Sequence, residues 1–148
     1  MNLDAATARD RFANARRAHL ATADAAGHPH LVPVTFAVSS DRVYIAIDSK
    51  PKRSMDLKRL KNFAENPSVT LLADEYDDDW TRLWWARADG TARILTDDAD
   101  RQAPIQLLQA RYPQYVAEVP QGPVIEVTVN RWSGWSFADA TSDVTLLA

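Results

Sequence analysis

The stretch AHLATADAAGHPHLVPVTFAVSSDRVYIAID, residues 18–48, decides the class of fold. Its runs at 18–23, 30–38 and 42–48 are largely apolar, and they are separated by turn segments that contain Gly, Ser and Asp, a pattern typical of consecutive strands. Gly27 can supply the positive φ of a hairpin turn between the first two runs. The first half of the chain is therefore predicted to be an antiparallel β-meander.

The strand at 30–38 is predicted to be unusual. Alternation places Val32, Val34 and Phe36 on one face of it. Pro33 has no N–H to donate to a ladder, so we expect an edge strand or a bulge at this position.

The remaining elements follow from caps, breakers and periodicity. Asp4 can cap a helix that runs to about Arg17, and Ser54 can cap a second helix that ends before Asn66-Pro67. Pro104 indicates that a third helix, about 98–111, begins late or is kinked. Further strands are expected at 68–76, at 80–95 with a bulge near 88–90, at 123–129 and at about 135–138.

The expected fold is α+β and mostly β. With 148 residues, 46% of them hydrophobic and 25% charged, the chain suits one hydrophobic core. No repeat or linker divides it, so residues 1–148 are predicted to form a single domain. Six or seven antiparallel strands with two or three helices indicate a barrel or a sandwich.

Several function classes are excluded or disfavoured. The chain has no cysteine, which rules out thiolate metal sites and thiol nucleophiles. Charges interrupt the N-terminal apolar stretches, so we expect a cytoplasmic protein with no membrane span. His28 and His30 lack a third ligand nearby, and no metal site is expected. No phosphate-binding glycine loop or G-x-S-x-G motif occurs, and no catalytic residue is evident, which favours chemistry supplied by a bound cofactor.

The most informative segment for function is SKPKRSMDLKRLKNF, residues 49–63. It carries six basic residues and one acid, whereas the rest of the chain has a net charge of −8. Lys50, Lys52 and Arg53 stand where a helix begins, and cations there are unfavourable unless an anion binds to the helix N-terminus. We expect a phosphate or carboxylate site; the alternative is that Lys58 and Lys61 only form a solvated helix face. A local patch on an acidic body argues against nucleic acid as the partner.

Five tryptophans are many for this length. Trp84 and Trp85 are adjacent in a predicted strand, so their side chains face opposite sides of the sheet. One of them is expected to meet a partner subunit or a planar ligand, or else to be partly exposed.

Taken in order, these segments resemble the pyridoxamine-5'-phosphate-oxidase-like split β-barrels, and in particular their deazaflavin-dependent branch. The motifs that carry the resemblance are HLATADAAGHPHLVPVTFAV, VYIAIDSKPKR, LKRLKNFAENPSVTLLADEYDDDW, WWARADGTARIL and PVIEVTVNRWSGW. The resemblance implies a split barrel of about six antiparallel strands in a homodimer, with a cofactor bound at each of two sites between the subunits.

The resemblance also implies site residues. The segment that grips the cofactor phosphate or acidic tail corresponds to Lys50, Lys52, Arg53, Lys58 and Arg59, with Asn62 following. Pro33, Val34 and Thr35 correspond to the strand that lines the cofactor ring. Trp80 corresponds to an aromatic near the ring, contributed by the other subunit.

The chain lacks the extended C-terminal region of true pyridoxamine phosphate oxidases, so oxidation of vitamin B6 is not expected. The large basic cluster favours coenzyme F420, with a hydride passed to a small unsaturated organic substrate. Two alternatives stay open: an FMN-binding oxidoreductase of the same fold, and a non-catalytic protein that only holds a flavin or tetrapyrrole.

Overall fold

A computed structural model describes the backbone of residues 1–47 and 53–138, and the side chains of residues 1–47 and 58–138. All strands belong to one seven-stranded sheet in the order β2-β1-β5-β6-β7-β4-β3, and every pairing in it is antiparallel. Along the chain the elements are α1 (Ala5–Asn14), β1 (Ala18–Ala23), β2 (Pro29–Val34), β3 (Ala37–Ser39), β4 (Arg42–Ala46), α2 (Arg53–Glu65), β5 (Ser68–Glu75), the 3₁₀ helix η1 (Trp80–Arg82), β6 (Trp84–Leu95), α3 (Asp98–Arg111), α4 (Gln114–Ala117) and β7 (Val124–Ser136).

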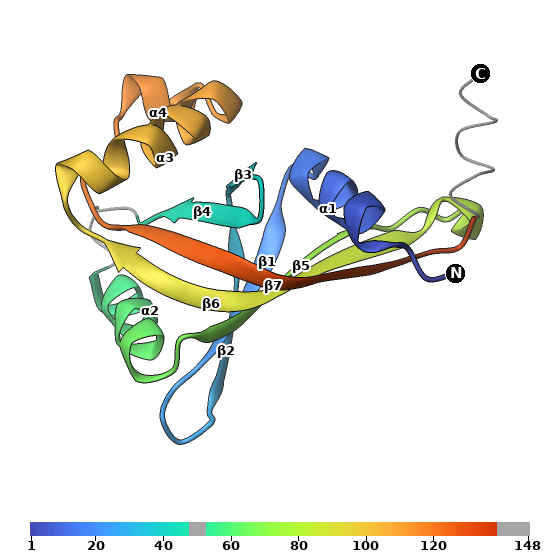
Figure 1. The fold of residues 1–148 in the computed structure, drawn as a ribbon, viewed down its shortest axis with the longest axis horizontal. Helices are drawn as coiled ribbons and strands as arrows, with labels where there is room; N and C mark the ends of the chain where they lie inside the picture. The colour runs from blue at the N-terminus through green and yellow to red at the C-terminus, as the bar shows by residue number, and fades with distance from the viewer. Residues whose placement is uncertain (48–52, 139–148) are drawn as a thin grey trace.

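The sheet curls into a split barrel. Its two edge strands, β2 and β3, are consecutive in the chain and are separated only by Thr35 and Phe36. A two-residue connection between the outermost strands is possible only if the sheet bends round on itself, as Figure 1 shows. The α+β, split-barrel fold predicted from the sequence is confirmed.

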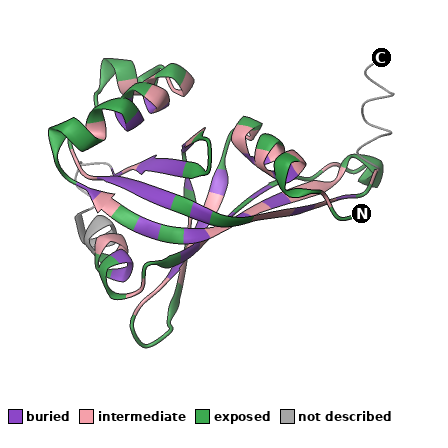
Figure 2. Cartoon of the chain, viewed as in Figure 1, coloured by how far each residue is buried: buried purple, intermediate pink, exposed green. Residues whose placement is uncertain are grey.

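The core lies inside the curled sheet, where Figure 2 shows the buried stretches of the strands. Its largest fully buried apolar side chains on strands are Leu20, Ile45, Leu71 and Ile125. Phe12 of α1 is also fully buried, with its ring 4.8 Å from that of Phe36. Helix α1 therefore packs against the barrel core and adds an aromatic side chain to its β-branched residues and leucines.

Two other helices dock on the sheet. Helix α2 reaches β1 and β6 and inserts Phe63, which is 3% exposed. Helix α3 lies against β3, β4 and β7, where Ile105 joins a second small cluster with Tyr44 and Val124. No helix in the described part of the chain is long and apolar enough to cross a membrane.

Several sequence predictions are confirmed in detail. Asp4 caps α1 by accepting the N–H of Thr7 at 2.8 Å. Gly27 has a φ of 84° in the first hairpin turn. Strand β2 is an edge strand, as Pro33 indicated, and the register of β6 against β7 shifts between Asp89 and Gly90.

Other predictions about elements are wrong. The strand expected at 30–38 is two strands, because the chain turns a corner at Thr35-Phe36. The strand expected from Trp80 begins at Trp84, after a 3₁₀ turn that Asp79 caps. The two closing strands are one, since β7 pairs with β6 along its whole length.

The helix boundaries also differ. Helix α2 begins at Arg53, so Ser54 lies inside it and is not its N-cap. Helix α3 begins at Asp98 and accommodates Pro104, which is buried, so the predicted late start is wrong. The short helix α4 was not expected, and α1 ends three residues before Arg17.

Candidate functional site

The segment expected to line a cofactor ring forms the corner between β2 and β3. Pro33 and Thr35 are exposed, whereas Val34 points into the core and is 7% exposed. The corner therefore presents two side chains and a stretch of edge backbone to the outside, while Val34 anchors it.

The register of β3 against β4 places this corner near the start of the basic segment. Ala37 lies opposite Tyr44 and Val38 opposite Val43. Ala37 is the first residue after the corner, so the corner adjoins the part of the ladder nearest the end of β4 at Ala46. Helix α2 begins only seven residues after Ala46, and seven residues span at most about 25 Å. The distance from the end of β4 to the start of α2 is therefore at most about 25 Å.

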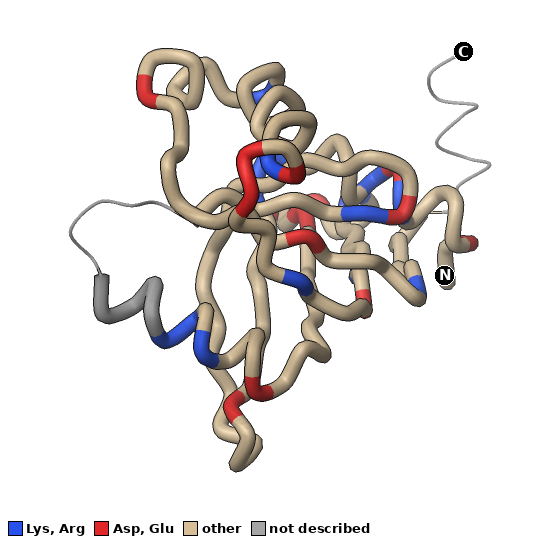
Figure 3. The backbone as a smooth tube through the Cα atoms, turned by 60° about the vertical axis from the view of Figure 1, so that its left-hand side comes forward, with Lys and Arg blue, Asp and Glu red and all other residues tan. Residues whose placement is uncertain are grey.

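Helix α2 carries the described cations of the basic segment (Figure 3). Lys58 and Lys61 are exposed, and the ammonium of Lys61 lies 3.7 Å from the carboxylate of Glu65. Arg59 is half-buried. Lys50 and Lys52 fall outside the described residues, as does the side chain of Arg53, so their proposed contacts remain predictions.

A small polar layer lies between α2 and the β1–β2 hairpin. Asn62 is 2% exposed, and its amide donates to the hydroxyl of Thr22 at 3.2 Å. His30 lies opposite Thr22 in the ladder, and its Nδ1 is buried without a hydrogen-bond partner among the described residues. A buried polar atom without a partner is costly, and here it sits under a helix rich in cations. The exposed cations of α2, Lys58 and Lys61, suit an anionic ligand beside this layer. Asn62, however, is used for internal packing of the layer.

Trp80 lies on the opposite side of the molecule from α2. It is 61% exposed on η1, at the far end of the β5–β6 hairpin (Figure 1). Within one chain it is not brought together with Pro33, Thr35 or the cations of α2. The expectation that it reaches a site in the other subunit remains a prediction.

The two adjacent tryptophans face different environments. Trp84 packs against the core cluster under α1, with the guanidinium of Arg11 5.7 Å from its ring centroid. Trp85 lies on the outer face of the sheet beside Trp135 of β7, and the guanidinium of Arg87 is 5.7 Å from its ring centroid. The predicted division between the two faces is confirmed, and Trp85 is the one left for a partner or ligand.

The outer face of β2, β1, β5 and β6 is exposed and partly apolar. Residues that pair across these strands share a face, which groups Pro33, His19, Leu72 and Arg87 in one row and Leu31, Ala21, Thr70 and Asp89 in the next. Leu31 is 67% exposed and Leu72 is 37% exposed. We define these two rows, with Trp85, as the outer face.

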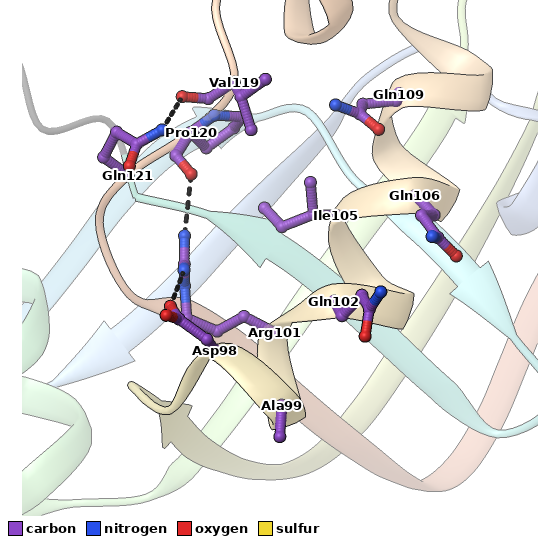
Figure 4. A pocket seen from close by; sticks show the side chains of 10 residues that line it. All are labelled: Asp98, Ala99, Arg101, Gln102, Ile105, Gln106, Gln109, Val119, Pro120 and Gln121. Atoms are coloured by element: carbon purple, nitrogen blue, oxygen red, sulfur yellow. Dashed lines mark hydrogen bonds and ion pairs between the residues drawn. The ribbon is translucent and has the colours of Figure 1, made fainter.

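A separate hollow of about 430 Å³ lies between α3 and the segment Val119–Gln121. Figure 4 shows Arg101 spanning it to the carbonyl of Pro120, 2.7 Å away, while also pairing with Asp98. Its Nε donates to Gly122 as well. Its two charged residues, Arg101 and Asp98, are thus already paired, and the other polar side chains that line it are neutral amides.

Sequence reasoning missed Tyr112 and Tyr115. Tyr115 Oη lies 2.8 Å from Thr35 Oγ1, and Tyr112 Oη accepts the backbone N–H of Phe36 at 3.1 Å. Both come from the region of α3 and α4, about eighty positions away along the chain. No local pattern signals a contact of that range.

Comparison with known proteins places these features in a family. Residues 5–136 match the family described as pyridoxamine 5'-phosphate oxidase. No curated protein matches the chain.

Solved structures of similar fold include two flavin-binding proteins and one heme protein. A FAD-binding protein from Mesorhizobium loti superposes with a TM-score of 0.72 at 18% identity, over 90% of this chain and 95% of that one. The FAD-binding protein from Mycobacterium smegmatis gives 0.62 at 22% identity, over 91% and 96%. The heme storage protein HutZ from Vibrio cholerae gives 0.68 at 14% identity, over 90% and 95%. At these identities the likeness concerns the fold.

Proposed function

Since the chain belongs to the pyridoxamine 5'-phosphate oxidase family, we propose that it is an oxidoreductase that binds coenzyme F420 at the α2 end of the barrel and passes hydride to a small unsaturated organic substrate. The observation that carries the proposal is the concentration of six cations at residues 50–61, in a chain whose remainder is acidic. The tail of F420 bears a phosphate and several glutamate carboxylates, so it matches a cluster larger than one phosphate requires.

When bound, the deazaflavin supplies the hydride. The chain's own residues bind and orient it: the cations at the start of α2 hold the acidic tail, and the exposed edge at Pro33 and Thr35 lies against the ring. Val34, buried in the core, keeps that edge in place.

The second candidate is a flavin, FMN or FAD, in the same place. It is favoured by the FAD-binding proteins of the same fold. A third possibility, storage of a tetrapyrrole without turnover, has the heme storage relative in its favour.

We also propose a homodimer in which the outer face is covered by a second copy. Leu31 on the edge strand β2 and Leu72 on β5 are large apolar side chains left exposed on the outer face, and exposed apolar surface is a feature of interaction sites. A second copy would supply the Trp80 that one chain holds away from the corner.

The test is a side-by-side titration of the purified protein with F420, FMN, FAD and heme, followed by fluorescence or absorbance. We expect reduced F420 to bind at least ten times more tightly than FMN. Equal or reversed affinities would refute the F420 assignment, and heme as the tightest ligand would favour storage.

Two variants test the anion site. A charge-assisted hydrogen bond is worth about 1.5–3 kcal/mol, so Lys52→Ala and Arg53→Ala should each weaken F420 binding about ten- to a hundredfold. Arg17→Ala is the matched control because Arg17 is exposed and lies outside α2. Arg101 would be a poor control, since its loss frees the carbonyls of Pro120 and Gly122. Unchanged affinity in both α2 variants would mean that the anion binds elsewhere.

A further inference from the structure

At the corner between β2 and β3, the backbone hydrogen-bonds to a side chain and not to a neighbouring strand. Phe36 donates its backbone N–H to Tyr112 Oη at 3.1 Å, and the hydroxyl of Tyr112 lies 3.1 Å from the carbonyl of the same residue. One phenol therefore takes the place of a partner strand for both backbone groups of Phe36. This explains why the strand can break there without leaving a buried amide unpaired.

The helix end that carries Tyr112 is itself fixed. The neighbouring Arg111 donates to the carbonyls of Ala13 and Ala15, at the end of α1. Its guanidinium also stacks on the buried ring of Phe36, 4.7 Å from the centroid. These contacts of Arg111 hold the end of α3, and with it the position of Tyr112 beside the corner.

Tyr115 extends the same arrangement to the exposed side of the corner. Its ring contacts that of Tyr112 edge-on, with centroids 5.7 Å apart. Its hydroxyl lies 2.8 Å from Thr35 Oγ1, and either oxygen can be the donor. If Tyr115 donates, the single hydrogen of the Thr35 hydroxyl is left to point outward. That arrangement makes Thr35 a hydrogen-bond donor toward whatever lies against the corner.

We propose that Tyr115 is a positioning residue for the bound cofactor: it donates to Thr35 Oγ1 and thereby directs the Thr35 hydroxyl toward an acceptor on the cofactor ring. This inference rests on the proposed function, and it adds a cofactor-positioning pair that the sequence does not signal. The ring carbonyls of flavins and deazaflavins are acceptors of the required kind, so the pair acts on either cofactor.

The experiment compares Tyr115→Phe, Thr35→Val and the double variant with wild type. Tyr115→Phe keeps the ring contact with Tyr112 and removes only the hydroxyl. Dissociation constants for F420 and FMN are measured by fluorescence titration, and melting temperatures are measured without cofactor. Loss of one neutral hydrogen bond should weaken binding of the preferred cofactor about three- to tenfold.

Three outcomes together support the proposal. Each single variant weakens binding, the double variant is no weaker than Thr35→Val, and the melting temperature stays within about 2 °C of wild type because the pair is exposed. Thr35→Ser, which keeps the hydroxyl, should restore binding to within about twofold. Non-additivity of this kind is the signature of two groups acting as one.

Three results would overturn the proposal, and they can be told apart. If Tyr115→Phe binds the cofactor like wild type while Lys52→Ala does not, the cofactor site stands and the positioning role is refuted. If wild type binds neither F420 nor FMN, both the proposed function and this inference fail. If the melting temperature of the variants falls enough to account for the whole loss of binding, Tyr115 and Thr35 have a structural role only.

Discussion

Replacing Leu31 with aspartate should dissociate the proposed homodimer. Leu31 is 67% exposed in a single chain, and complete burial of a leucine side chain is worth about 1.5–3 kcal/mol. The part still exposed is thus worth about 1–2 kcal/mol if a second copy covers it. A two-fold axis buries the residue twice, so the loss is about 2–4 kcal/mol, or about a 30- to 1,000-fold rise in the dimer dissociation constant.

Sedimentation velocity across a range of micromolar concentrations measures this change. Val119→Asp is the control: Val119 is an exposed apolar residue, 45% exposed, in the segment beside α3 and on none of the strands of the outer face. Circular dichroism and the melting temperature check that both variants fold. Because the proposed site needs both subunits, Leu31→Asp should also weaken F420 binding, whereas the control should not.

A Leu31→Asp protein that remains dimeric at the lowest concentration would refute the outer-face interface. Equal dissociation in Leu31→Asp and Val119→Asp would refute it as well, because the effect would then not depend on the face. A wild-type protein that is monomeric throughout would refute the homodimer itself.

Three further outcomes are expected. Gly134→Ala should destabilise the fold by about 1–3 kcal/mol in urea unfolding, since a Cβ at that position would lie 2.7 Å from the carbonyl oxygen of Trp85. An unchanged urea midpoint would show that β6 and β7 lie farther apart at this position than described. The backbone N–H of His28 holds the pKa of Asp24 below its ordinary value of 3.8, so the carboxylate stabilises the fold above that pH and the effect is lost as the pH falls through the lowered pKa. Asp24→Ala should therefore lower the melting temperature at pH 7, and its melting temperature should approach that of wild type below pH 3.8. A difference in melting temperature that stays constant with pH would contradict this. F420 affinity should fall steeply between about 0.05 and 0.5 M salt if several charge pairs bind the tail, and a flat profile would argue against them.

The elements that the sequence predicted correctly are those set by local chemistry. Asp4 caps α1, Gly27 turns the first hairpin, and Pro33 marks an edge strand. Each of these residues acts through its own backbone angles or through hydrogen bonds to residues within three positions. Family membership also followed from the order of such local signals along the chain.

The errors fall where tertiary contacts override a local signal. The strand expected at 30–38 breaks because Tyr112 supplies both hydrogen bonds of Phe36. Pro104 lies inside α3 and is buried there, and β7 continues through Gly134 because β6 pairs with it all the way. Prediction from a short stretch of sequence cannot include these partners, because they are many residues away along the chain.

The sequence alone determined that this chain has a cationic segment at 50–61, an edge at Pro33 and a β-barrel pattern, because charge, ring closure and alternation are properties of neighbouring residues. Only the tertiary structure decided that the residues after the corner pair with β4, that Asn62 is used inside the polar layer, and that Tyr115 touches Thr35. The physical reason is that hydrogen bonds and burial join residues by distance in space, and the closure of the sheet brings together positions that the chain keeps eighty residues apart.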